Sequence, residues 1–416
     1  MDPSAIKRFL VLCSGFLLAV VLLIGWKEMH HPQPVALTPT LTGQTEYCLT
    51  CHAGLQPISP SHPVEDFGCV RCHGGERLAL DANLAHSTLL NGRNPSDLTV
   101  VQTACGGDAC HSGPAAAVRD QLQRVLTNLH TTYAGAIAAV RYAHGAQADL
   151  TAHFGLTTGE GTGATQSAGL RALTAFDPLN ETGAWAKIFV QNCLTCHLSA
   201  QPMAGAAMAR LTGCAACHTA TGGEAPSTSH RLTTAIAYQQ CNTCHNRGTY
   251  SVHTLQFQPR TDQPTKRQQD YYLPGTPMAK CEYQLDCVDC HTRQEIMGEG
   301  VLYSHPADAQ YIQCLTCHGS LTSPPLTYTI ASPTDLALQL AALNPAVRLQ
   351  VGDTILVTAR GEPLWNIHRL PDGTFEVIGK ATGQHYRLPL VQGSACQQQP
   401  NAQKAQDCHV CHAAQP

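Results

Sequence analysis

The chain has 416 residues, of which 21 are cysteine and 22 are histidine, and only 13% are charged. Its formal net charge of −4 excludes the basic balance that nucleic-acid binding requires, so we expect no nucleic-acid partner. The length would allow two or three domains, yet aromatic residues make up only 6% of the chain. Large apolar side chains are too sparse for that many ordinary cores, so something else must fill part of the interior.

The N-terminal segment has a membrane-targeting pattern. Two basic residues precede an apolar run over 9–25, which is at the short end of what spans a bilayer. Because basic residues stay cytoplasmic, we expect 1–8 to be a cytoplasmic tail, 9–26 a transmembrane anchor, and the rest exported. A cleaved signal peptide is the alternative, although no small-x-small cleavage site follows the run. The favoured interpretation is a single-pass membrane protein.

Three segments follow the anchor. Residues 27–44 are rich in proline and threonine and predict an extended tether. Residues 45–113 form a first cysteine-rich block. In 114–187, apolar residues recur at three- and four-residue spacing from Pro114 to about Gly145, and a glycine-rich loop comes next. This spacing predicts one long internal helix.

The rest of the chain contains a second cysteine-rich block, a β-rich segment and a last cysteine pair. The second block covers 188–320, and the final segment is 396–416. Between them, 321–395 contains short β-rich runs separated by turn signals such as Pro371-Asp372-Gly373. These runs predict a small antiparallel meander or barrel.

Most of the cysteines belong to one short motif. Eight segments read Cys-x-x-Cys-His, and a ninth has four residues between its cysteines. The motif cysteines are Cys48, Cys51, Cys69, Cys72, Cys105, Cys110, Cys193, Cys196, Cys214, Cys217, Cys241, Cys244, Cys287, Cys290, Cys314, Cys317, Cys408 and Cys411. The motif histidines are His52, His73, His111, His197, His218, His245, His291, His318 and His412.

The spacing has a chemical reason. Two thiols three residues apart reach the two vinyl groups of one haem, and the adjacent histidine is then held beneath the iron. On these motifs the chain resembles the multihaem c-type cytochromes, including electron-conduit members, from about Cys48 to His412. The ninth motif resembles that of the small tetrahaem class III cytochromes. The resemblance implies about nine covalently bound haem c groups.

Two other interpretations of the motifs stay open. Paired cysteines can be half of a zinc site, but zinc does not require a histidine directly after the second cysteine. Cys105 and Cys110 could instead form a plain disulfide loop.

The spacing from Cys48 to Cys69 recurs from Cys193 to Cys214, which suggests a duplicated two-haem module.

Histidines outside the motifs are candidates for the second axial ligand of each iron. His62 and His305 each lie in Ser-His-Pro, and His130 and His144 would share one face of the predicted long helix. The candidates are His62, His86, His130, His144, His153, His230, His253 and His305. His368 and His385 fall in predicted strands and are weaker candidates.

In the repeated module the position of His62 is taken by Ala207. A remote histidine, or Met203 or Met208, would then complete that haem, and a methionine would raise its potential. Gap filling is the ordinary role for both methionines. Cys281 and Cys396 lie outside the motifs and could form a disulfide on the exported side.

The fold class we expect is mainly α and irregular, packed around haem, with an N-terminal transmembrane helix, a long internal helix and a small antiparallel β domain. Closely spaced haems favour an electron conduit between a membrane or periplasmic donor and an external acceptor. Its partners would be redox proteins or a membrane electron-transfer complex, met on the periplasmic or extracellular side. The alternatives are a multihaem reductase or oxidase of a small nitrogen or sulfur species with one open-site haem, and a docking module. No Cys-x-x-Cys-Lys motif, found in some such enzymes, is present.

Overall fold

A computed structural model gives the architecture of the chain. The residues that it describes are 3–29, 33–92, 94–158, 169–170, 172–200, 211–219, 230–245, 250–257, 279–396 and 405–413. The chain divides into two compact units. The first consists of Met1–Leu55 with His62–Leu89, and the second of Gln56–Ser61 with Leu90–Pro416. Met203, Ala207 and Met208 lie outside the described residues.

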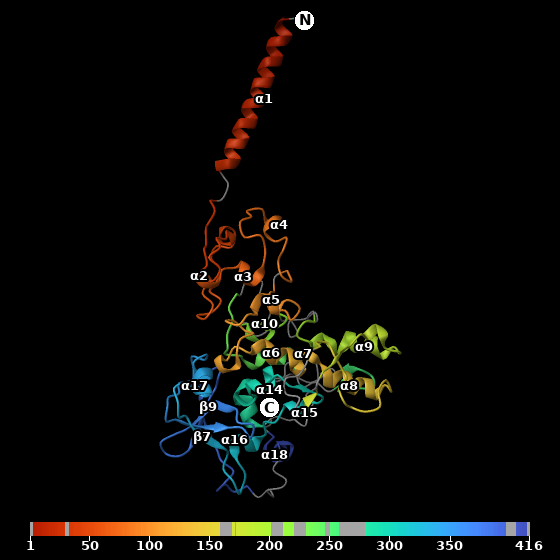
Figure 1. Cartoon of the computed structure of the whole chain (residues 1–416), viewed down its shortest axis with the longest axis vertical. Helices are drawn as coiled ribbons and strands as arrows, with labels where there is room; N and C mark the ends of the chain where they lie inside the picture. Colours follow the sequence, from red (N-terminus) through yellow and green to blue (C-terminus); the bar gives the residue numbers. More distant parts are fainter. Residues whose placement is uncertain are drawn as a thin grey trace. The chain divides into compact units, whose positions relative to one another are not determined.

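The first unit begins with the long helix α1, Pro3–Met29, drawn in red in Figure 1. Its 27 residues would extend about 40 Å at 1.5 Å per residue, which exceeds a hydrocarbon core of about 30 Å. The segment Ile6–Lys27 has a mean hydropathy of 2.6, and none of it is buried within the protein. The helix is therefore long and apolar enough to be a membrane anchor, and a signal sequence would have the same properties.

In the described part of the first unit that follows α1, the helical segments are short. They are η1 Cys48–Thr50, α2 Val64–Phe67, α3 Val70–His73 and α4 Ala82–Ala85. Gly68 ends α2 with a φ of 65°, and a Cβ atom there would collide with Glu46 Oε1. A side chain at position 68 would therefore be disfavoured both by backbone conformation and by the close approach of Glu46.

The prediction of one long internal helix from Pro114 to about Gly145 is wrong. The second unit has three short helices there: α6 Gln121–Thr127, α7 Leu129–Thr132 and α8 Ala134–Ala143. Asn128 is extended between the first two, and its side chain accepts from the His130 N–H, which competes with helix continuation. Tyr133 adopts the left-handed conformation between α7 and α8, with its hydroxyl donating to Cys193 O.

The other helices of the second unit are also short. In chain order they are α5 Val101–Cys105, η2 Ala115–Ala117, η3 Pro178–Asn180, α9 Trp185–Asn192, η4 Leu194–Cys196, α10 Ala215–His218, α11 Tyr238–Asn242, α12 Lys280–Gln284, α13 Cys287–Cys290, α14 Arg293–Met297, α15 Pro306–Ala309, α16 Cys314–His318, α17 Leu336–Ala341 and α18 Ala405–His412. Six strands of two residues each pair between loops: β1 Phe154–Gly155, β2 Gly169–Leu170, β3 Thr174–Ala175, β4 Tyr250–Ser251, β5 Gln256–Phe257 and β6 Leu302–Tyr303.

An apolar cluster joins α8 to α9. It is formed by buried side chains that include Ile137, Trp185 and Phe189, and it also contains Leu255, which follows β4. Phe189 and Ile137 are each 1% exposed. This cluster fixes α9, and through it the start of the motif at Cys193.

The small antiparallel sheet expected near the C-terminus is confirmed. Its strands are β7 Thr327–Thr329, β8 Thr354–Val357, β9 Pro363–Arg369, β10 Phe375–Ile378 and β11 His385–Leu388, in the order β11-β10-β9-β8-β7. Each strand pairs antiparallel with its neighbour in the chain, so the sheet is a meander. Helix α17 packs against the sheet beside β9 (Figure 1). Ala337 of this helix is buried beside Ile355.

Candidate haem-binding sites

The motif cysteines lie on single turns of helix. Each of η1, η4, α10, α11, α13, α16 and α18 begins within or just before a Cys-x-x-Cys-His motif, and α3 begins directly after Cys69. Residues three apart on a helical turn lie on the same side, so both thiols of a motif project together. This is the arrangement needed for two bonds to one edge of a macrocycle.

One backbone hydrogen bond recurs in these motifs. The N–H of the motif histidine donates to the carbonyl of the first cysteine in the motifs ending at His52, His73, His218, His245 and His291, at 2.8–3.0 Å. This bond closes the turn and brings the imidazole next to the first thiol. The recurrence shows that these five segments share one backbone geometry.

The longer ninth motif closes in the same way. After α5 ends at Cys105, the chain turns back so that His111 N donates to Cys105 O at 3.2 Å. Cys110 N donates to Gly107 O at 2.9 Å inside this loop. The two extra residues are thus absorbed by the loop, and the ends of the motif keep the relation found in the shorter motifs.

The motif histidine His245 faces the candidate axial ligand His130. Nε2 of His245 lies 3.2 Å from Nε2 of His130, with the ring centroids 5.4 Å apart. Metal–imidazole bonds are about 2.0 Å long, so two nitrogens on opposite sides of one metal are about 4 Å apart. The pair is therefore within an ångström of the separation that a shared iron requires.

The protonation of His130 suits a ligand. Its Nδ1 donates to Asn128 Oδ1 at 2.8 Å, which leaves Nε2 unprotonated in the neutral ring. Burial and the neighbouring His245 lower the pKa of His130 to about 4, so the ring is neutral near pH 7. A second pair, His52 and His86, has ring centroids 6.0 Å apart within the first unit. Both pairs join a motif histidine to a predicted distal histidine.

The remaining distal candidates stay predictions. His62 packs against Phe67 with ring centroids 5.0 Å apart. His144 stacks on Trp185 and its Nε2 donates to Val252 O at 3.1 Å. Because α6, α7 and α8 are separate, His130 and His144 do not share one helix face, and that expectation is wrong.

Four further distal candidates have other surroundings. His305 is the N-cap of α15 and His230 lies in a loop before α11. His153 and His253 are exposed. The two weaker candidates flank Glu376 in the sheet: His385 Nδ1 is 2.9 Å and His368 Nε2 is 3.7 Å from Glu376 Oε2.

In His218, His291 and His318, a hydrogen bond to another part of the protein holds the ring nitrogen Nδ1. Nδ1 of His218 donates to Thr233 O at 2.9 Å, and Nδ1 of His318 donates to Pro389 O at 2.7 Å. Nδ1 of His291 donates to a carboxylate, Glu295 Oε2, at 2.8 Å. A metal-bound histidine usually donates its other N–H in this way, which fixes the tautomer and leaves Nε2 for the metal. These residues fit an iron ligand.

His197 does not fit in this arrangement. Its Nδ1 accepts from Ser199 N at 3.3 Å, and its Nε2 donates to Thr131 O at 2.7 Å, so the proton is on the nitrogen that would bind iron. Its backbone N–H donates to Leu194 O rather than to Cys193 O. The His197 motif therefore departs from the others in both backbone and side chain.

Comparison with known families adds an independent observation. Residues 240–319 match the family model described as Cytochrome c554 and c-prime. The matched segment contains the motifs that start at Cys241, Cys287 and Cys314. It supports a c-type cytochrome, with covalently bound haem c and a haem-based role in electron transfer. Comparison with curated proteins and with solved structures gave no match.

The motifs lie against one another in pairs. The thiol of Cys48 hydrogen-bonds that of Cys69, Cys241 bonds Cys287, and Cys314 bonds Cys408. In each pair the two residues are the first cysteines of different motifs. Groups attached at these cysteines would be close neighbours.

Further contacts join these pairs within the second unit. Cys244 Sγ donates to Cys196 O at 3.6 Å, and helix α10 contacts α11. The motifs that start at Cys193, Cys214 and Cys287 thus each contact the motif that starts at Cys241, and the motif at Cys314 contacts that at Cys408.

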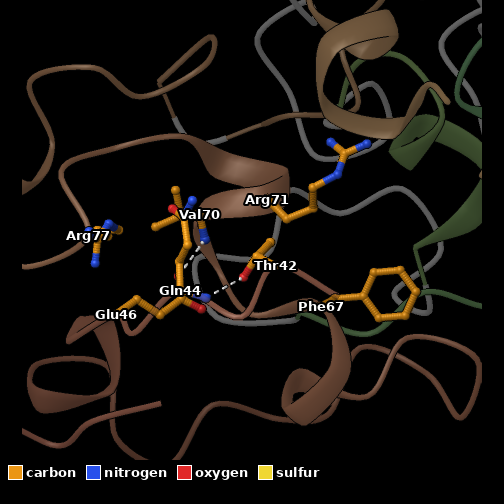
Figure 2. Close-up of a pocket in the computed structure, with 7 residues that line it drawn as sticks. All are labelled: Thr42, Gln44, Glu46, Phe67, Val70, Arg71 and Arg77. Carbon is orange, nitrogen blue, oxygen red and sulfur yellow. Dashed lines mark hydrogen bonds between the residues drawn. The ribbon is translucent and has the colours of Figure 1, made fainter. Parts of the chain in front are cut away.

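The sequence analysis did not identify Glu46, the acidic residue that positions the motif starting at Cys69. Glu46 is 2% exposed, and its two carboxylate oxygens accept from Cys69 N at 2.7 Å and Val70 N at 2.9 Å. Figure 2 shows Glu46 reaching Val70 beside the small pocket that Arg71 and Arg77 help to line. The contact spans more than twenty residues of chain, so no local pattern signals it.

Cysteines outside the motifs do not pair in the structure. Cys281 and Cys396 each carry a free thiol, and so does Cys13 within α1. Burial raises the pKa of Cys281. A disulfide between Cys281 and Cys396 stays a prediction.

Proposed function

We propose that this protein is a multihaem c-type cytochrome that moves electrons along about nine low-spin haems. The electrons would pass between a membrane or periplasmic donor and an external acceptor. When bound, each haem supplies one-electron redox chemistry. The chain's own task is to hold each macrocycle with two thiols and to supply two strong axial ligands.

The observation that carries the proposal is the facing pair of His130 and His245. A conduit needs irons held by two protein ligands, because little then reorganises when an electron arrives. The two nitrogens point at one another from separate segments, and Asn128 fixes the tautomer of His130. The first cysteines of different motifs are also in contact, which supports short distances between haems.

The proposed location is the exported side of a membrane. Helix α1 would anchor the chain, with the haem-binding segments on the periplasmic or extracellular side and basic residues Lys7 and Arg8 in the cytoplasm. Redox partner proteins or a membrane electron-transfer complex would then reach the haems from that side. Recovery of the protein from the membrane fraction with Met1 retained supports the anchor, and a mature N-terminus after α1 contradicts it.

Replacement of His130 with alanine tests the proposal. The variant should lose the sixth ligand at the haem of His245 and show a high-spin ferric EPR signal of about one haem per chain. His385→Ala is the matched control, because that imidazole contacts Glu376 in the sheet instead of a motif histidine. No new high-spin signal in His130→Ala would refute the assignment. A high-spin signal already present in the unaltered protein, sensitive to nitrite or cyanide, would favour the reductase alternative.

A further inference from the structure

The motif ending at His291 differs from those ending at His218 and His318 in the group that accepts the hydrogen bond from Nδ1 of the histidine. His291 Nδ1 donates to Glu295 Oε2 at 2.8 Å, four residues later at the start of α14. His218 and His318 donate instead to the neutral carbonyls of Thr233 and Pro389. These three histidines therefore offer one comparison within a single chain: a carboxylate acceptor against two amide acceptors.

Glu295 is fixed in place as a charged acceptor. Its side chain is only 1% exposed, so it has almost no contact with solvent. Its other oxygen, Oε1, accepts from the backbone N–H groups of Tyr311 and Ile312, each at 2.7 Å. A carboxylate that accepts three N–H bonds is strongly favoured over the protonated acid. The Glu295 backbone is held too, since its carbonyl accepts from Asn128 Nδ2 at 3.1 Å.

Such an acceptor changes the metal ligand electronically. A carboxylate that receives the N–H of a metal-bound histidine draws the proton toward itself and raises the basicity of the ring. A more basic ligand donates more charge to the iron and stabilises the ferric state over the ferrous state. A backbone carbonyl fixes the same tautomer with a much weaker effect, because it carries no net charge.

We propose that Glu295 is a potential-setting residue that gives His291 histidinate character. The haem held by His291 then has a lower reduction potential than those held by His218 and His318. The step concerned is the gain of one electron by ferric iron, with no bond formed or broken. This inference rests on the proposed function, because it requires that His291 bind haem.

The position of His291 makes this potential matter for electron flow. Its motif contacts the motif of His245, because helix α13 packs against α11 and Cys287 lies beside Cys241. A low-potential haem beside that of His245 sets the free-energy difference for an electron that passes between the two. Glu295 thereby controls transit through the second cysteine-rich block.

A neighbouring cation does not cancel this effect by contact. Lys380 donates its ammonium to Val288 O at 2.6 Å and interacts electrostatically with Asp289 and Glu362. The ammonium is thus on the cysteine side of the motif and is balanced by two carboxylates. Glu295 instead bonds directly to the histidine ring.

Glu295→Gln tests the proposal, because glutamine keeps the shape and a neutral acceptor but removes the charge. One haem of the variant should become easier to reduce by at least tenfold in its reduction equilibrium constant, which is about 59 mV for one electron. Its ferric EPR g-values should also move toward those of ordinary bis-histidine haem. Glu376→Gln is the matched control, since Glu376 contacts His385 in the sheet, and it should change neither quantity.

A measurement on the unaltered protein covers the case in which the variant fails to load haem. Near-infrared magnetic circular dichroism should then show one ferric haem with a charge-transfer band typical of a histidine–histidinate pair. Unchanged potentials and g-values in a fully loaded Glu295→Gln protein would overturn the proposal, as would the absence of that band. Failure of the proposed function is distinct: it would appear as missing haem in the unaltered protein.

Discussion

Removal of the buried ammonium of Lys380 should uncouple the sheet from the motif at Cys287. Lys380 is 8% exposed, lies 4.8 Å over the Trp365 ring and donates from Nζ to Val288 O at 2.6 Å. Its backbone N–H donates to Asp289 Oδ1 at 2.7 Å. Burial lowers the pKa of Lys380 and raises that of Asp289, so each charge depends on its partners for compensation.

The expected loss follows from these contacts. A hydrogen bond to a charged group contributes about 1.5–3 kcal/mol and a desolvated cation–π contact about 2 kcal/mol. Lys380→Met keeps the length of the side chain but leaves Asp289 as a buried carboxylate with less compensation. We therefore expect the free energy of unfolding to fall by about 3–5 kcal/mol.

Chemical denaturation followed by far-ultraviolet circular dichroism measures this loss. Asp289→Asn and the double variant complete a thermodynamic cycle, and the double variant should lose less than the sum of the two single losses. Lys187→Met is the control, because Lys187 is exposed on α9. A loss below about 1 kcal/mol in Lys380→Met, or strict additivity in the cycle, would refute the electrostatic reasoning.

Two other predictions concern the ion pairs and the broken helix. Asp120 accepts from Arg124 and Arg293 at 2.6 Å each; burial opposes its ionisation, but the two guanidinium groups prevail and lower its pKa. Because the folded pKa lies below the ordinary value of about 3.9, this stabilisation is present above that pH and is lost as pH falls through the folded pKa. Asp120→Asn should therefore lower the denaturation midpoint at neutral pH and reduce its fall in acid; an unchanged pH profile would contradict this. Asn128→Ala removes the acceptor of His130 Nδ1 and should lower the free energy of unfolding by about 1–3 kcal/mol. The variant should also show a partial high-spin EPR signal. Full stability and an unaltered spectrum would contradict this prediction.

The sheet could be predicted because its signals are local. Alternating apolar residues and turns such as Pro371-Asp372-Gly373 specify strands with a period of two, and the observed β8 to β11 follow them. β7, Thr327–Thr329, also lies within the predicted β-rich segment 321–395, but three residues carry too short a pattern to locate a strand. The motif turns are local as well, because three-residue spacing itself fits one helical turn.

The breaks between α6, α7 and α8 and the role of Glu46 could not be predicted in that way. The apolar spacing around Leu122 and Ile137 is helical, but Asn128 binds a carbonyl of α14, and Tyr133 binds Cys193 O. Both contacts join segments far apart in the sequence, and neither leaves a periodic trace. Glu46 is hidden for the same reason, because it bonds to a motif more than twenty residues away.

The most direct test of the account is a joint count of haems and spins in the full-length protein. Pyridine haemochrome gives haems per chain, and quantitative EPR of the oxidised protein gives the low-spin fraction. The nine motifs predict nine haems, all or nearly all low-spin and six-coordinate. A ratio of eight would show that Cys105 and Cys110 hold no haem, and the departure of His197 makes its haem the weakest site. A ratio well below eight, or one full high-spin haem per chain, would contradict the conduit.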